Sequence, residues 1–105
     1  MVEVSRIFVD QYTCIGMKLQ LHFKEILIIG SEDYYVLPLI FSIEFIAQLD
    51  TNIPIIICSY QESFDGLLNS EVLGFNYAAS VCGVNLKMNG KEAIICCENF
   101  KKKTL

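Results

Sequence analysis

Side chains alternate without a break over residues 12–23, and this pattern constrains the fold more than any other feature of the sequence. One set of positions is mostly apolar: Thr13, Ile15, Met17, Leu19, Leu21 and Phe23. The positions between them are more polar: Tyr12, Cys14, Gly16, Lys18, Gln20 and His22. Because successive side chains of a strand point to opposite faces, this period of two predicts a strand with one buried face and one wet face. His22 is then expected at the surface.

Four further segments have the composition of strands. Val2–Val9 is rich in β-branched residues, whereas Ile26–Ile29 and Ile55–Cys58 are apolar throughout, which predicts two strands buried on both faces. The segment 34–41 contains Pro38, which has no N–H to donate to a neighbouring strand. That strand is therefore expected at an edge of the sheet, or bulged at Pro38.

Short helices are expected over residues 43–49, 62–68 and 77–82. Ser42 and Asn76 have side chains suited to cap the first and the third of these helices. Gly83 suits the left-handed conformation that often ends a helix, and Val84 can supply the apolar contact after it.

Asn89-Gly90 allows two structures. The pair is typical of a two-residue hairpin turn between strands over 84–88 and 92–97. Asn89 and Glu92 also have the spacing of a capping box, and a helix starting there would end in three lysines beside the negative end of its dipole. That helix would place Ala93, Cys96 or Cys97, and Phe100 on one face. Spacing alone leaves both structures open.

The chain is expected to form one domain over residues 1–105, a common domain size. Its 53% hydrophobic and 19% charged residues exclude intrinsic disorder. The expected fold class is α/β (α+β): a mixed or antiparallel central sheet with an N-terminal strand pair, and three to four short helices packed on it.

A cytoplasmic protein with no membrane partner is expected. The most apolar stretch, residues 34–49, contains Glu44 and falls short of the roughly 20 apolar residues that a spanning helix needs. The first six residues do not place a basic start before an apolar block, as a signal peptide would.

Charge is unevenly distributed along the chain. Residues 25–86 hold eight acidic side chains and no lysine or arginine, whereas residues 87–105 hold five lysines. The net charge of −4 argues against a nucleic-acid partner. Either the lysines complement the acidic segment within one chain, or they meet the acidic face of another copy in a homo-oligomer. High salt would weaken the second arrangement.

The five cysteines are odd in number, form no CxxC pair and lie mostly among apolar neighbours, so they are expected to be small core side chains. A redox role would need Cys96 or Cys97 exposed. With one histidine in the chain, no Cys/His zinc site is expected, and no metal site is predicted.

Two groups of residues are candidates for binding. Glu32, Asp33 and Asp65 follow predicted strands and could hold Mg²⁺ or Ca²⁺ through oxygen, but no metal-loop spacing accompanies them, so a turn role is favoured. Asn89, Gly90 and Lys91 form the candidate anion-binding site, because a helix starting there would offer N–H groups beside a lysine. The scattered glycines match no nucleotide-binding motif, so the cofactor stays unknown.

Four stretches of the second half form a further pattern: Asp65-Gly66-Leu67-Leu68-Asn69, Asn76-Tyr77-Ala78-Ala79, Cys82-Gly83-Val84 and Met88-Asn89-Gly90-Lys91-Glu92-Ala93-Ile94. They resemble the YunC-like family, small bacterial and archaeal proteins of unassigned function. The resemblance extends in length and element order over nearly the whole chain, and it implies that Asn89-Gly90 opens the last helix. Lys87 stands where the family tends to have glycine, and Leu37-Pro38 where many members carry Cys-Gly. An activity that depends on that cysteine is not expected here.

Two hypotheses for function follow. The first is a binding or interaction module that acts as a homo-oligomer, since the chain is very apolar and has no convergent polar motif. The alternative is an enzyme or enzyme subunit with a shallow site near Glu32, Asp33 and Asp65. Convergence of these carboxylates in one pocket would favour the enzyme. The small-molecule ligand, if any, stays unknown.

Overall fold

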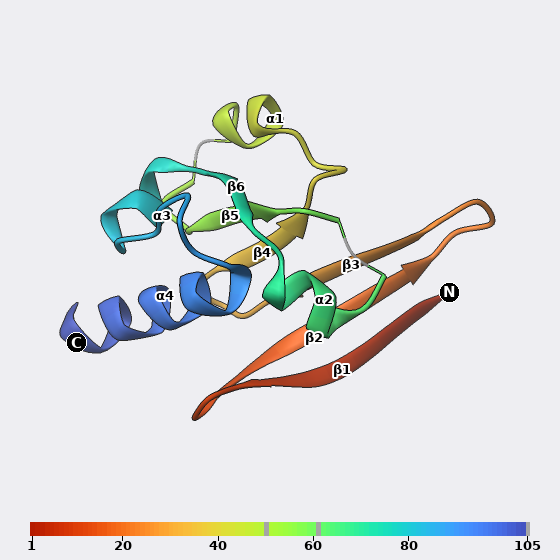
Figure 1. The fold of residues 1–105 in the computed structure, drawn as a ribbon, viewed down its shortest axis with the longest axis horizontal. Coiled ribbons are helices and arrows are strands. Elements are labelled where there is room, and N and C mark those ends of the chain that lie inside the picture. The colour runs from red at the N-terminus through yellow and green to blue at the C-terminus, as the bar shows by residue number, and fades with distance from the viewer. Residues whose placement is uncertain (50, 61, 105) are drawn as a thin grey trace.

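Six strands lie in one sheet, in the order in which they occur along the chain, in this computed structural model (Figure 1). The structure describes residues 1–49, 51–60 and 62–104. The strands are β1 (Val2–Val9), β2 (Tyr12–Gln20), β3 (Glu25–Gly30), β4 (Tyr35–Pro38), β5 (Ile55–Cys58) and β6 (Val72–Phe75). Neighbouring strands are antiparallel except β4 and β5, which are parallel. The mixed α+β class with an N-terminal strand pair is confirmed.

Four helices accompany the sheet: α1 (Ile43–Ala47), α2 (Phe64–Asn69), α3 (Tyr77–Val81) and α4 (Gly90–Thr104). Ser42 and Asn76 cap α1 and α3 as predicted, each accepting a backbone N–H of the first turn. Gly83 has a φ of +99° after α3, where Val84 N–H donates to Ala79 O. Among the described helices, only α4 is longer than six residues.

Asn89 and Glu92 form the capping box, so the segment is a helix start and not a hairpin. The Asn89 N–H donates to Glu92 Oε1 at 3.1 Å, and the Glu92 N–H donates to Asn89 Oδ1 at 2.8 Å. Ala93, Ile94 and Cys97 are the buried side chains of α4, and they face the sheet.

The two faces of the sheet are covered unequally. α2, α3 and α4 contribute to the main core on one face, with Leu67, Ala79 and Ile94 packed over the strands. On the other face α1 covers the β4–β6 half, where Ile46 packs with Leu37, Ile55 and Ile57 in a second core cluster. Helices therefore lie over both faces of β4–β6, but over one face of β1–β3 (Figure 1).

The predicted orientation of β2 is wrong. The strand exists, but Cys14 and Gly16 are its buried residues, while Ile15 and Met17 are exposed. A Cβ on Gly16 would lie 2.9 Å from Phe64 Cε1, so the missing side chain at Gly16 is what lets the Phe64 ring of α2 reach the strand. The helices thus pack against the small residues of β2, and the larger apolar residues of this strand point to the other face of the sheet.

Other details of the strands also differ from expectation. β2 ends at Gln20, and reciprocal backbone hydrogen bonds between Leu21 and Lys24 close a hairpin turn that exposes His22 at the surface, as predicted. In β3 only Leu27, Ile29 and Gly30 are buried, because the other face lacks a helix.

Pro38 is not in an edge strand. β4 lies between β3 and β5, and Pro38 is its last residue. The pairing with β3 involves only Tyr35 and Val36, so the absent N–H of Pro38 removes no bond from that ladder. β6 was not predicted, because four residues that include Gly74 give a weak strand pattern.

Candidate functional site

The acidic residues predicted near a site do not gather in one pocket of the described structure. Glu32 lines a shallow pocket on the sheet, Asp33 lines a cleft beside α4, and Asp65 lies in the first turn of α2. Among the described residues, no group of three or more His, Cys, Asp or Glu side chains could hold a metal ion. Asp33 instead forms an ion pair with Lys101, with 2.7 Å between Oδ2 and Nζ.

Asn89, Gly90 and Lys91 open α4, as a helix-terminal anion site requires, but internal contacts occupy this end of the helix. The Gly90 N–H donates to Ser70 O at 3.1 Å, and Gly90 is buried. The Glu92 N–H is bonded to Asn89, and Lys91 Nζ lies 3.9 Å from Asp10 Oδ1. Anion binding at this point stays a prediction, and these contacts give it no support.

All five cysteines are free thiols. Cys14, Cys58 and Cys97 are buried, whereas Cys82 and Cys96 are half-buried. Burial raises the pKa of each thiol, that of Cys58 to about 11. Since the thiolate is the reactive form, these surroundings suit structural cysteines better than redox ones.

Leu37 and Pro38 lie at the end of β4, and both are buried. Leu37 packs with Ile46 of α1 and with Ile55 and Ile57 of β5. Leu37 and Pro38, which stand where many YunC-like proteins carry Cys-Gly, are therefore part of the hydrophobic core in this chain.

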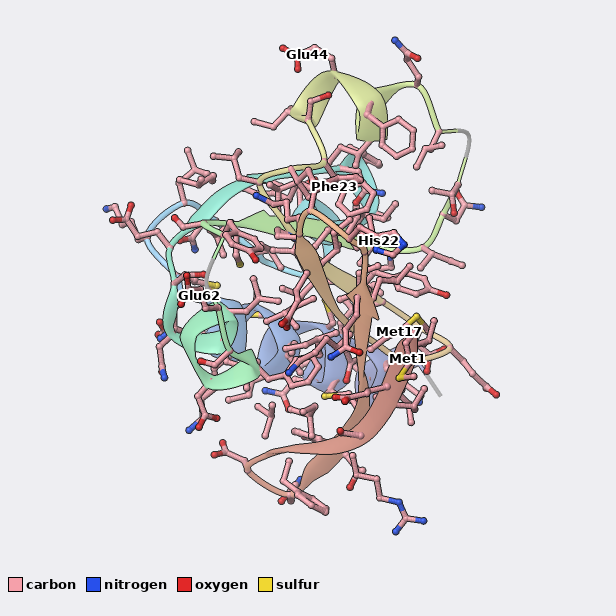
Figure 2. The ribbon with its side chains drawn as sticks, turned by 90° about the vertical axis from the view of Figure 1, so that its right-hand side faces the viewer. Met1, Met17, His22, Phe23, Glu44 and Glu62 are labelled. Carbon is pink, nitrogen blue, oxygen red and sulfur yellow. The ribbon has the colours of Figure 1, made fainter. Side chains whose placement is uncertain are left out.

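The uncovered half of the sheet carries an apolar surface that we call the open face. Its members share the side of β1–β4 that faces away from α2 and α4, and they are Val2, Val4, Ile15, Met17, Ile28 and Tyr35. Val4, Met17 and Ile28 stand directly opposite one another on adjacent strands. Figure 2 shows Met17 on the opposite side of the sheet from α2 and α4.

Several large side chains of the open face are exposed to solvent. Val2 is 55% exposed, Val4 63% and Ile15 44%. The Tyr35 ring lies over Gly30, where an added Cβ would be 2.6 Å from Tyr35 Cδ1. Ile15, Met17 and Ile28 line a shallow depression of about 300 Å³ beside that ring.

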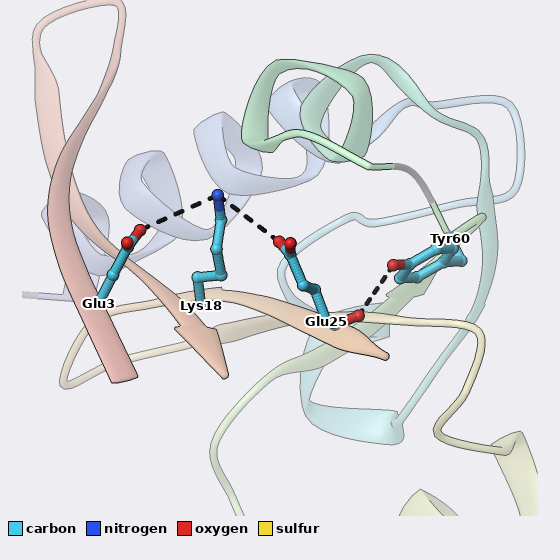
Figure 3. A network of polar contacts seen from close by, with 4 residues as sticks. All are labelled: Glu3, Lys18, Glu25 and Tyr60. Atoms are coloured by element: carbon cyan, nitrogen blue, oxygen red, sulfur yellow. Dashed lines mark hydrogen bonds and ion pairs between the residues drawn. The ribbon is translucent and has the colours of Figure 1, made fainter. Parts of the chain in front are cut away.

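The helix side of the same strands has a polar margin (Figure 3). Lys18 Nζ lies 3.9 Å from Glu3 Oε2 and 3.7 Å from Glu25 Oε2, and Tyr60 Oη donates to Glu25 O at 2.8 Å. The part of this face that α2 does not cover therefore carries charged side chains, which are readily hydrated. Apart from Arg6, which lies opposite Ile15, the open face presents apolar side chains along the same strands.

A separate cleft of about 400 Å³ lies between α3 and α4. Tyr77, Val81 and Phe100 contribute its large apolar side chains, and Asp33 and Lys101 its charged ones. The hydrogen bond to Asp33 raises the pKa of the Lys101 ammonium. Tyr34 Oη donates to Glu98 Oε2 at 2.7 Å, which gives the β3–β4 turn a second contact with α4.

Sequence reasoning did not single out the cleft, because its walls come from segments far apart in the chain. Tyr77 could have been noticed as an aromatic side chain at the start of a capped helix, and it is 83% exposed. Nothing in the local pattern places it near Lys101.

No family model matches the chain, and no curated protein matches it. A protein of unknown function from Thermoplasma acidophilum, TA1206, has a similar crystal structure, with a TM-score of 0.78 at 15% sequence identity. The match covers 92% of this chain and 93% of that one. At such low identity the similarity shows a shared fold. Among the described residues, no helix is long and apolar enough to cross a membrane.

Proposed function

We propose that this protein is an interaction module that assembles with copies of itself through the open face. The observation that carries the proposal is the row of Val4, Met17 and Ile28, aligned across three strands. Val4 and Met17 are exposed, and Ile28 is half-buried at the edge of the second core cluster. Adjacent exposed apolar side chains of this kind mark protein–protein contact sites, whereas single scattered ones do not.

One further observation favours a module over an enzyme, and another bears on the compartment. Glu32, Asp33 and Asp65 do not converge in a described pocket, so the alternative of a shallow carboxylate site has less support. The five free cysteines fit a reducing compartment, and we place the module in the cytoplasm. Membership of the YunC-like family stays a prediction, consistent with a neighbour of unknown function.

The experiment is to measure the mass of the native protein by sedimentation, with and without a charge on the open face. We expect the original chain to be an oligomer and Met17→Glu to be a monomer, because an interface that buries the new carboxylate leaves it unpaired. Circular dichroism should show the same fold for both proteins.

Leu86→Glu is the matched control. Leu86 is 62% exposed in the loop before α4 and Met17 is 37% exposed, so the same acidic charge replaces a more accessible apolar side chain away from the open face. We expect its mass to equal that of the original chain. A monomeric original chain, or an unchanged mass for a folded Met17→Glu, would contradict the proposal.

A further inference from the structure

The cleft between α3 and α4 has the dimensions and the lining of a small-molecule site. Its volume of about 400 Å³ falls within the range of roughly 300–1,000 Å³ usual for such sites. Tyr77 and Val81 on α3 are 83% and 48% exposed, and Phe100 on α4 is half-buried. The core does not cover these side chains, and an apolar group bound between the two helices would shield them from water.

The charged groups of the cleft form a matched pair. Asp33 Oδ2 and Lys101 Nζ are 2.7 Å apart, and both side chains are nearly half exposed. An exposed pair of this kind contributes little to stability, so a ligand that supplies both opposite charges can replace it at little cost. A ligand with a single charge would displace one member of the Asp33–Lys101 pair without replacing the charge of that member.

An α-amino acid carries a carboxylate and an ammonium group on the same carbon atom, which suits two protein charges in direct contact. We propose that the cleft binds a free amino acid with an aromatic or branched apolar side chain. Its ammonium group pairs with Asp33 and its carboxylate with Lys101, while its side chain lies against Tyr77 and Val81. The Asp33–Lys101 ion pair opens, and each of the two residues forms an ion pair with the ligand.

The position of Asp33 is well supported for this role. The Asp33 N–H donates to Ser31 Oγ at 3.0 Å, which shapes the β3–β4 turn. The neighbouring Tyr34 is 1% exposed, and its hydroxyl is bonded to Glu98 on α4. These contacts fix the turn against α4, one turn of helix before Lys101, so binding needs side-chain movement only.

The test is isothermal titration of the full chain with phenylalanine and leucine, beside N-acetylphenylalanine and phenylalaninamide. Each blocked compound keeps the ring and removes one charge. We expect phenylalanine to bind at least tenfold more tightly than either blocked form. Equal binding of all three would show an apolar cleft without charge recognition, and no binding of any would also overturn the proposal.

Variants locate the site. Asp33→Asn and Lys101→Met should each weaken phenylalanine binding at least tenfold, with Lys87→Met as the control, since Lys87 is an exposed lysine in the loop before α4. Tyr77→Ser should weaken the binding of free and blocked compounds alike. Unchanged affinity in the two charge variants, with thermal midpoints near that of the original chain, would contradict the assignment. Sedimentation of the same samples keeps the result separate from the question of assembly.

Discussion

Cys58 illustrates how burial in this fold affects the protonation of a cysteine thiol. It is the last residue of β5, 0% exposed, and its neighbours on adjacent strands are Pro38 and Val72. Desolvation is the main reason why the pKa of this thiol rises from 9.0 to about 11. The thiol therefore stays protonated at neutral pH and contributes as a small apolar side chain.

Alkaline pH should destabilise the protein through Cys58. Above pH 9.0 the unfolded thiol loses its proton while the folded one keeps it until about pH 11. The unfolded state then binds fewer protons, so the free energy of unfolding decreases as pH rises, by about 2–3 kcal/mol for this group. Below pH 9.0 the full stability is present.

Urea denaturation of the original chain and of Cys58→Ala, measured from neutral pH to about pH 11, checks this expectation. The variant loses some stability at every pH because it leaves a small cavity, so the quantity to compare is the slope against pH. Other buried acids, such as Tyr34 and Cys97, contribute equally to both proteins. Parallel slopes would refute the role given to Cys58.

At the scale of elements, local sequence signals are sufficient to predict where several of the helices begin. Ser42, Asn76 and Asn89 could each be recognised in the sequence, because a cap is formed by residues three positions apart. Gly83 was predictable for the same reason, since its φ of +99° ends α3 within one turn. Such features depend little on the rest of the fold.

The orientation of β2 could not be predicted in this way. Either face of an alternating strand could be the buried one, and the packing of the helices determines which face is buried. Here Phe64 of α2 packs on Gly16, a contact between residues 48 positions apart that the hydropathy of β2 does not contain. The orientation of β2 also determines which side chains form the open face, the candidate binding surface. The hydropathy pattern therefore did not predict that surface either. The cleft beside α4 depends on long-range contacts in the same way.

The capping box of α4 gives a prediction at this scale. Asn89→Ala removes the acceptor of the Glu92 N–H, and this change should lower the free energy of unfolding by about 0.5–2 kcal/mol. Asn89→Ser keeps a capping oxygen and should recover most of the loss. Urea denaturation with the same m-value for all three proteins provides the measurement. An Ala variant as stable as the original chain would show that the cap contributes little.

At the scale of the whole molecule, charge and apolar surface lie in different places. Lysines of the C-terminal segment pair within the chain, Lys101 with Asp33 and Lys91 with Asp10. The Lys101–Asp33 contact favours the expectation that the lysines complement the acidic segment in one subunit, whereas Asp10 lies outside that segment. The open face, by contrast, lies over β1–β4 and leaves α4 on the other side of the sheet (Figure 1). An assembly through it would bury valine, isoleucine and methionine, and few charges.

Salt therefore separates assembly through the open face from the charge pairing between copies that the sequence suggested. Pairing of the lysine-rich end with an acidic face should weaken as ionic strength rises from about 0.05 M to about 1 M, because the screening length falls to about 3 Å. Burial of the open face should persist, since apolar burial does not depend on charge. We expect the sedimentation mass to stay constant over this range and Leu86→Glu to behave in the same way. Dissociation at high salt would instead assign the contact to Lys101, Lys102 and Lys103.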